Sequence, residues 1–209
     1  LALTDGAAKL RAAVRIVRDF GAPVVVFTEF LATQSALCAA LADAGVRAER
    51  FHGGMTDEER RRAVQAFRER GGALVSTEAG GEGQNWQFCS AVLNYDLPWN
   101  PMRVEQRIGR VHRLGQSRDV LVVNMYTEET VEEHVYRLLR DKVRLFEQVI
   151  GDVDVILGTA ADEEDTFERA IGRIILEAAT ATDLGAGFSR LGRRLAEARR
   201  CHDAARRRR

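Results

Sequence analysis

Short apolar runs alternate with segments of helical periodicity along the first 126 residues. The runs have strand length and are rich in β-branched residues, and they lie at 23–28, 46–52, 73–77, 91–96 and 120–126. Between the second and third runs, Thr56 and Glu59 form a capping-box signature ahead of Val64 and Phe67, which share one helical face. Such runs are typical of strands buried beneath helices on both faces of a sheet. The pattern therefore predicts an α/β fold around a parallel sheet.

Helical patterns continue toward the carboxyl terminus. An Asn-Pro pair at 100–101 supplies an N-cap and a first-turn proline for one helix. Thr130 and Glu133 repeat the capping box before a long helix that reaches Ile150. Two more amphipathic helices are expected, at 167–180 and 184–200.

The charge is balanced overall but unevenly distributed. The 209 residues hold 31 Lys and Arg against 31 Asp and Glu, whereas the stretch 152–168 carries seven acids and no Lys or Arg. The last twenty residues, 190–209, hold nine arginines and two acids, and the end of this tail is expected to be a surface arm. This change in charge distribution predicts a first domain at 1–151 and an acidic-then-basic helical extension at 152–209.

Composition argues against several classes of protein. No apolar run approaches the roughly 18 residues of a membrane span and no signal peptide opens the sequence, so a cytoplasmic protein with no membrane partner is expected. Cys38, Cys89 and Cys201 are far apart and form no C-x-x-C pair. This spacing indicates free thiols, and no metal site is assigned.

The segment 76–85 leaves the third strand and contains three glycines, at positions 80, 81 and 83. Glycines there allow backbone N–H groups to approach a phosphate. The segment matches no established phosphate-binding pattern, so a simple tight turn is the alternative.

A polar stripe follows on the helix that begins at Pro101. Gln106, Arg110 and Arg113 are spaced i, i+4 and i+7, which places them on one side of a continuous helix. Planar guanidinium groups in this register suit a polyphosphate, whereas a solvated basic face is the plainer interpretation. Trp99, just before this helix, either stacks on a nucleic acid or covers the edge of the sheet.

A P-loop lysine is missing from the sequence. The only lysines, Lys9 and Lys142, do not follow glycine, so no Walker A motif is present, and no acidic magnesium motif lies at a strand end. We therefore expect that this chain does not hydrolyse ATP by itself.

The ordered set of segments from 21 to 151 resembles the second RecA-like lobe of superfamily 2 motors, specifically the Swi/Snf-type double-stranded DNA translocases. The resemblance predicts a RecA-like sheet with helices on both faces, followed by a helical extension. The final motif, Q-x-x-G-R-x-H-R-x-G-Q, is the most specific, and the finer likeness is to the bacterial branch that includes an RNA-polymerase-associated recycling ATPase. The matching segments lie at 26–30, 51–56, 76–85, 96–101 and 106–116.

The resemblance implies roles in ATP turnover. Arg110 and Arg113 would be arginine fingers, and Gln106 would couple their motif to the cleft between two lobes. Gly83 and Asn85 would lie beside the nucleotide ribose. ATP with Mg²⁺ would be bound mainly by an N-terminal RecA-like lobe of the same parent polypeptide, which is absent from this sequence.

The resemblance also implies contacts to nucleic acid and to partners. Double-stranded DNA would be held by its phosphates, and Trp99 and Asn100 would lie near the path that couples DNA to ATP. RNA polymerase or another DNA-bound complex is the implied protein partner. Glu78 and Glu82 lie in the segment 76–85, at positions where eukaryotic relatives often carry a basic or apolar residue. The phosphate contacts would come from Thr28, Gly53, Ser76 and Thr77.

Two other functions compete with this interpretation. The same architecture serves RNA helicases, although the last motif and the Trp-Asn-Pro segment favour the DNA branch. The chain could also be a non-catalytic nucleic-acid-binding or regulatory module in which the arginine tail binds phosphate and the lobe is only a scaffold.

Overall fold

The computed structural model describes residues 2–3, 6–77, 84–112, 116, 118–138, 140 and 167–206. The chain divides into two compact units. The first consists of Leu1–Leu97 and Gln106–Glu129, and the second of Pro98–Glu105 and Thr130–Arg209. The boundary expected near residue 151 lies outside the described residues.

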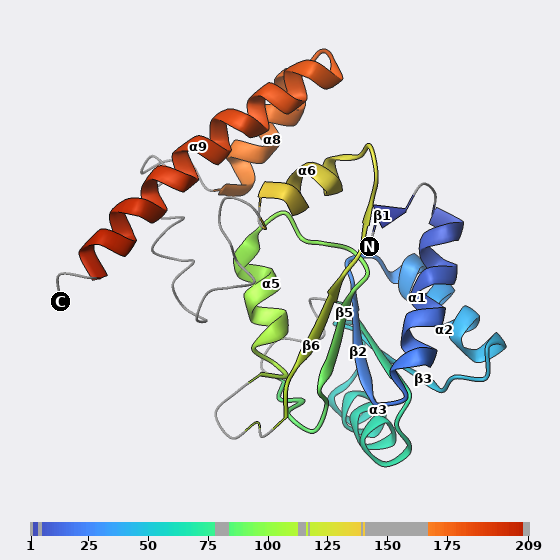
Figure 1. Cartoon of the computed structure of the whole chain (residues 1–209). Coiled ribbons are helices and arrows are strands. Elements are labelled where there is room, and N and C mark those ends of the chain that lie inside the picture. Colours follow the sequence, from blue (N-terminus) through green and yellow to red (C-terminus); the bar gives the residue numbers. More distant parts are fainter. Residues whose placement is uncertain are drawn as a thin grey trace. The chain divides into compact units, whose positions relative to one another are not determined.

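The first unit is built on a 5-stranded parallel sheet in the order β3-β4-β2-β5-β6 (Figure 1). Every neighbouring pair in this sheet is parallel, so all five carboxyl ends lie at one edge. A separate short pair joins β1 (Ala2–Leu3) to β7 (Tyr126–Thr127). The five strands are β2 (Val24–Thr28), β3 (Ala48–Phe51), β4 (Ala73–Thr77), β5 (Ala91–Asn94) and β6 (Leu121–Asn124).

Helices cover both faces of the sheet. Buried side chains of α1 (Gly6–Phe20) and α2 (Leu31–Asp43) pack against one face, around Val24 and Val26. On the other face, α3 (Asp57–Arg70) packs against Val25 and Phe27. The alternation along β2 explains this, because successive side chains of a strand point to opposite faces. The predicted α/β class is confirmed, and each of the five predicted runs contains a strand of this sheet. The last run is divided, because Tyr126 belongs to β7 and pairs with β1.

The amino terminus of α3 has the predicted capping box. The Thr56 hydroxyl accepts a hydrogen bond from the Glu59 backbone N–H, and the Glu59 carboxylate accepts one from the Thr56 N–H at 2.8 Å. These hydrogen bonds from Thr56, led by the one from its backbone, lower the pKa of Glu59. The local signature is sufficient here because both partners lie within one turn.

Two helix predictions are wrong in detail. Helix α5 (Pro101–Ile108) ends before Arg110, because Gly109 follows and glycine is a poor helix former, so Gln106, Arg110 and Arg113 do not share one continuous helix. At α6 (Val131–Arg137), Thr130 is the N-cap residue but its side chain makes no capping bond. Instead, the Thr130 carbonyl accepts the Glu133 N–H at 3.1 Å. Most of the long helix expected up to Ile150 lies outside the described residues.

The second unit contains a helical hairpin. Helices α8 (Phe167–Glu177) and α9 (Ala181–Arg206) confirm the two predicted amphipathic helices. The hairpin packs tightly, because a Cβ on Gly187 would lie 2.6 Å from Ile174 Cγ2. Helix α6 joins the same unit through His134, whose ring stacks on Phe188 with centroids 5.2 Å apart and planes 9° apart.

Gly72, just before β4, is needed for strand packing. Its φ is +87°, and a Cβ there would lie 2.3 Å from the Arg47 carbonyl oxygen. We expect Gly72→Ala to lower the free energy of unfolding by about 2 kcal/mol or more, since positive-φ strain and steric overlap combine. Gly45→Ala is the matched control, because φ is +75° there but no atom lies within 4 Å of the added Cβ. If urea denaturation shows that both variants lose the same free energy of unfolding, the steric argument is contradicted.

Candidate functional site

Four predicted phosphate-contacting residues meet at the carboxyl edge of the sheet. Thr28 is directly opposite Thr77 in the register of β2 and β4, and Ser76 is opposite Phe51 of β3, two residues before Gly53. The Thr28, Ser76 and Thr77 side chains are buried, whereas Gly53 is exposed. The sheet therefore brings these residues to one edge, although three of them are covered.

A hydrogen-bonded carboxylate lies beside this edge at the switch between β2 and β5. The Thr28 hydroxyl donates to Asp96 Oδ2 at 2.5 Å, and the Glu29 backbone N–H donates to the same oxygen at 3.1 Å. The Lys9 Nζ lies 3.9 Å from Asp96 Oδ1 and 5.1 Å from the centre of the Tyr95 ring. Ligands of open parallel sheets bind outside such a switch point. Here the Thr28 hydroxyl and the Lys9 ammonium are engaged within the protein.

Arg107 is buried beside this carboxylate, with 2% of its surface exposed. One terminal nitrogen donates to the Asp96 carbonyl at 2.7 Å and to Asn94 Oδ1 at 3.3 Å, and the other lies 4.0 Å from Glu29 Oε1. The guanidinium carbon lies 5.3 Å from the centre of the Phe27 ring. Arg107 thus holds together the ends of β2 and β5.

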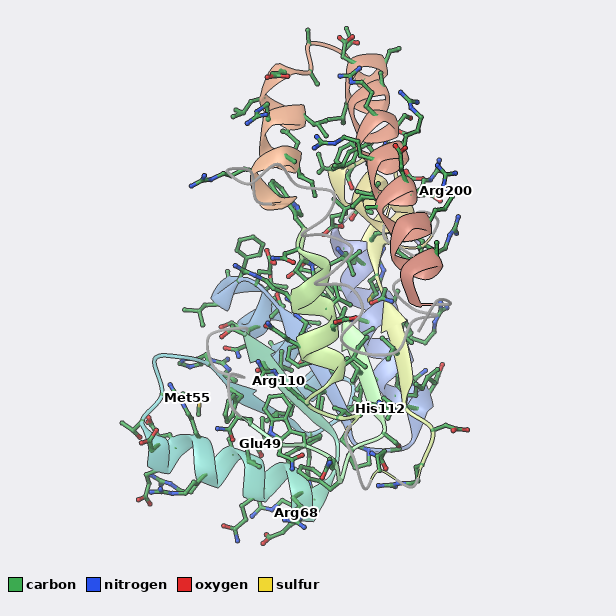
Figure 2. All side chains as sticks on the ribbon, turned by 90° about the vertical axis from the view of Figure 1, so that its left-hand side faces the viewer. Glu49, Met55, Arg68, Arg110, His112 and Arg200 are labelled. Atoms are coloured by element: carbon green, nitrogen blue, oxygen red, sulfur yellow. The ribbon has the colours of Figure 1, made fainter. Side chains whose placement is uncertain are left out.

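Arg110 is placed differently, in the turn after α5 (Figure 2). Its side chain is partly exposed, and its backbone carbonyl accepts a hydrogen bond from the Trp86 N–H at 2.8 Å. Trp86 is fully buried, and its ring packs against Phe27 and Phe51, with centroids 6.0 and 5.5 Å away. The end of the Gly-rich segment is therefore connected to the turn that carries Arg110.

Gln116 strengthens this connection. Its side-chain amide N–H₂ donates to the carbonyls of Gln87 at 2.9 Å, Cys89 at 3.1 Å and Val111 at 3.4 Å. Its amide oxygen accepts the Arg118 backbone N–H at 3.1 Å, while the Arg118 guanidinium donates to the Phe88 carbonyl at 2.8 Å. One amide thus fixes the backbone on both sides of the junction between residues 86–89 and 110–111.

Replacement of Gln116 by glutamate tests this junction. The variant keeps the shape of the side chain but removes its N–H donors and places a carboxylate oxygen against carbonyl oxygens. We expect the free energy of unfolding to fall by about 2 kcal/mol, as for other buried acceptors that lose a donor. Gln65→Glu, at an exposed glutamine of α3, also loses one hydrogen bond, to Glu69 at 2.9 Å, but in solvent, so it should lower the free energy of unfolding by less than about 1 kcal/mol. Urea denaturation of the two variants gives the comparison, and similar values would show that the Gln116 amide is dispensable.

The thiol of Cys89 lies in the same turn. Its Sγ is 2.7 Å from the Pro23 carbonyl oxygen and 3.2 Å from that of Ala91. Burial raises the pKa of this thiol, as it does for Cys38. Both cysteines are free and buried, in agreement with the sequence analysis.

The other predicted site residues are dispersed. Asn85 is exposed, and its side chain accepts the Gln87 N–H at 3.2 Å; Gln106 is also exposed. Trp99 and Asn100 belong to the second unit, where Trp99 is 41% exposed and the Asn100 carbonyl accepts the Arg103 N–H at 3.1 Å. Gly83 and Arg113 lie outside the described residues.

Sequence reasoning missed several residues that build this edge. The sequence analysis placed Asp96, Arg107 and Gln116 only within motif segments, and it considered Lys9 only in the search for a P-loop lysine. The sequence does not reveal that these polar and charged side chains are buried or partly buried, because a charged side chain on a helix is ordinarily exposed. The one available signal was Lys9, a rare lysine on the apolar side of its helix, next to Ala12 and Ala13.

A model of the helicase conserved C-terminal domain matches residues 8–115, which is more than half of the chain. The chain belongs to this helicase family. It is 44% identical over 171 residues to the uncharacterised ATP-dependent helicase YqhH of Bacillus subtilis, covering 82% of this chain and 30% of the relative. It is 39% identical over 122 residues to the RNA polymerase-associated protein RapA of Vibrio vulnificus, covering 57% of this chain and 13% of that protein. The chain thus spans less than a third of the length of these relatives.

Solved structures share the fold of this helicase domain. The C-terminal part of the Fun30 ATPase domain matches with a TM-score of 0.58 and 22% identity, covering 70% of this chain and 50% of that one. The E. coli DEAD-box protein SrmB matches with a TM-score of 0.59 and 24% identity, covering 73% and 89%. The family resemblance and the RecA-like fold expected from the motifs are confirmed.

None of the helices in the described ranges is long and apolar enough to cross a membrane. Within the same ranges, no group of three or more His, Cys, Asp or Glu side chains is placed to hold a metal ion.

Proposed function

We propose that this chain is the C-terminal half of an ATP-dependent double-stranded DNA translocase. In this proposal it supplies arginine fingers and a grip on the DNA backbone to an N-terminal ATP-binding lobe of the same parent polypeptide. The observation that carries the proposal is the position of Arg110, partly exposed in a turn that backbone hydrogen bonding ties to the end of the Gly-rich segment. A charged side chain held in such a turn suits a ligand that arrives from outside the lobe.

The contrast between two arginines three residues apart supports this role. Arg107 is buried among backbone and side-chain acceptors, so its charge serves the lobe itself. Arg110 lies in a turn whose backbone is hydrogen-bonded to Trp86, so the Cα that carries its guanidinium is held in place. Arg113, in the same motif, would be the second finger. Gln106, one turn before Arg110, would couple the motif to the cleft between the lobes.

ATP with Mg²⁺ would bring the phosphoryl group that is transferred. The guanidinium of Arg110 fits a phosphate chemically, and Asn85 and Gly83 would lie near the ribose. Lys9 is engaged with Asp96 and would not serve as the phosphate-binding lysine. In this proposal the N-terminal lobe holds the Mg²⁺.

The grip on DNA would use the carboxyl edge of the sheet. Gly53 is exposed there, while Thr28, Ser76 and Thr77 are buried, so we propose that backbone N–H groups contribute more than hydroxyls. Phosphate contacts of this kind hold a strand without reading its sequence. Trp99 and Asn100 would lie on the path between DNA and ATP. RNA polymerase or another DNA-bound complex is the proposed partner, by analogy with the RNA polymerase-associated relative.

The decisive experiment is an ATPase assay of this chain and of the complete parent polypeptide. Each is measured alone and with duplex DNA, single-stranded DNA and RNA. We expect a silent chain and a parent that duplex DNA stimulates. Stimulation by RNA instead would favour the RNA-helicase alternative, and a parent that never hydrolyses ATP would favour a non-catalytic binding module.

A further inference from the structure

Helix α9 carries a row of arginines that the motor assignment does not use. Arg190, Arg193, Arg194 and Arg200 are all exposed, and they lie within about 120° of the helix circumference. Glu197, the single acidic residue between Arg190 and Arg200, is exposed within the same arc and offsets one of their charges. Figure 2 shows Arg200 on the outer side of the helix. We call these four arginines the α9 arginine face.

The opposite side of α9 is apolar and packs against other helices of the second unit, so α9 cannot rotate freely and the α9 arginine face keeps one orientation within that unit. Phe188, Leu191, Leu195 and Ala198 are buried, and Phe188 stacks on His134 of α6. Close contact between Gly187 and Ile174 holds α8 against α9. A packed helix presents its charges as an ordered array, whereas a loose arm would lose more entropy on binding.

The positive charge is strongest toward the carboxyl end of the face. Near its start, Glu177 and Asp183 line a cavity of about 200 Å³ together with Arg190, which offsets part of the charge there. From Arg193 to Arg200 the only acid is Glu197, and the chain continues to an arginine-rich terminus.

We propose that the α9 arginine face binds the phosphate backbone of nucleic acid, as a second contact separate from the edge of the sheet. Arg190 to Arg200 spans about 15 Å along the helix, which matches several phosphates of a strand spaced about 3.4 Å apart along the duplex axis. Guanidinium groups bind phosphates in a bidentate manner without reading bases. An unbroken polyanion is the ligand that such a linear array fits.

The test measures binding of this chain to a labelled 30-base-pair duplex by fluorescence anisotropy between 50 and 200 mM salt. The variant replaces Arg190, Arg193 and Arg200 by glutamine. Losing three phosphate contacts should reduce the magnitude of the slope of log K against log salt by about 2.7. If the two curves meet at 200 mM salt, the Kd of the variant at 50 mM should be about 40-fold higher than that of the unmodified chain. A triple lysine variant keeps the charge and should retain most of the slope.

A matched control removes three arginines from another exposed helical stripe, Arg11, Arg15 and Arg18 of α1. If this control lowers the slope as much as the α9 variant, net charge alone accounts for binding and the proposal is overturned. An unchanged slope in the α9 variant also overturns it, as does equal competition by polyglutamate and duplex DNA at matched charge, since polyglutamate has no phosphates. Circular dichroism of each variant verifies that the helices remain folded. Because binding is read without ATP, the result is independent of the motor assignment.

Discussion

Replacing Arg110 by alanine in the complete motor should lower DNA-stimulated ATP hydrolysis by about 10³-fold, the lower end of the effect of an arginine finger. The turn that carries Arg110 is anchored through its backbone, so the substitution removes the guanidinium without moving its support. In the proposed role the Arg110 side chain meets developing phosphate charge and does not contact DNA, so DNA affinity should stay within about threefold. Steady-state kinetics and anisotropy on the same preparation measure the two quantities.

Two further variants separate charge from geometry. Arg110→Lys keeps the positive charge but loses the planar fork, so it should recover only a small part of the lost rate. Arg62→Ala, at an exposed arginine of α3, is the control and should leave turnover unchanged. Normal turnover in Arg110→Ala, or an equal loss in Arg62→Ala, would refute the finger assignment. Arg113→Ala is expected to behave like Arg110→Ala.

The fold was accessible from sequence because its signals are local. A buried parallel strand is a short run of apolar residues, as in β2, and the α3 capping box involves two residues three positions apart. The exceptions depend on backbone detail. At Thr130 the backbone carbonyl takes the N–H that the side chain was expected to take, and Gly109 stops α5 one turn early.

The site was only partly accessible, because burial of polar groups depends on partners far away in the chain. Thr28 and Asp96 are 68 residues apart, and no local pattern indicates that the threonine hydroxyl would be used there. Gln116 reaches Gln87 across 29 residues, so its structural role was hidden within a motif associated with phosphate binding. The proposed division of motif residues, into ones that meet ligand and ones that hold the lobe together, therefore depends on contacts and not on the motif itself.

Arg107 gives the sharpest test of that division. Replacing it by alanine should lower the free energy of unfolding of this chain by about 3–5 kcal/mol, because a buried charged group is removed and its acceptors, the Asp96 carbonyl and Asn94 Oδ1, lose their donor. Urea denaturation followed by the fluorescence of buried Trp86, in a Trp99→Phe background, measures the change. Arg103→Ala, at an exposed position of the same helix, should cost less than about 0.5 kcal/mol.

The arrangement around Asp96 also predicts coupling between Arg107 and Lys9. Both cations lie at this one residue, Arg107 on its carbonyl and Lys9 near its carboxylate. Removing either should loosen the loop that the other holds, so the Arg107→Ala and Lys9→Ala effects should be non-additive by about 0.5–3 kcal/mol in a double-mutant cycle. Additive effects would show that the two cations stabilise the edge independently. If Arg107→Ala alone lowers the free energy of unfolding by less than about 1 kcal/mol, water replaces the contacts of Arg107. Arg107 would then be a candidate for a role beside Arg110 in the proposed cleft between the lobes.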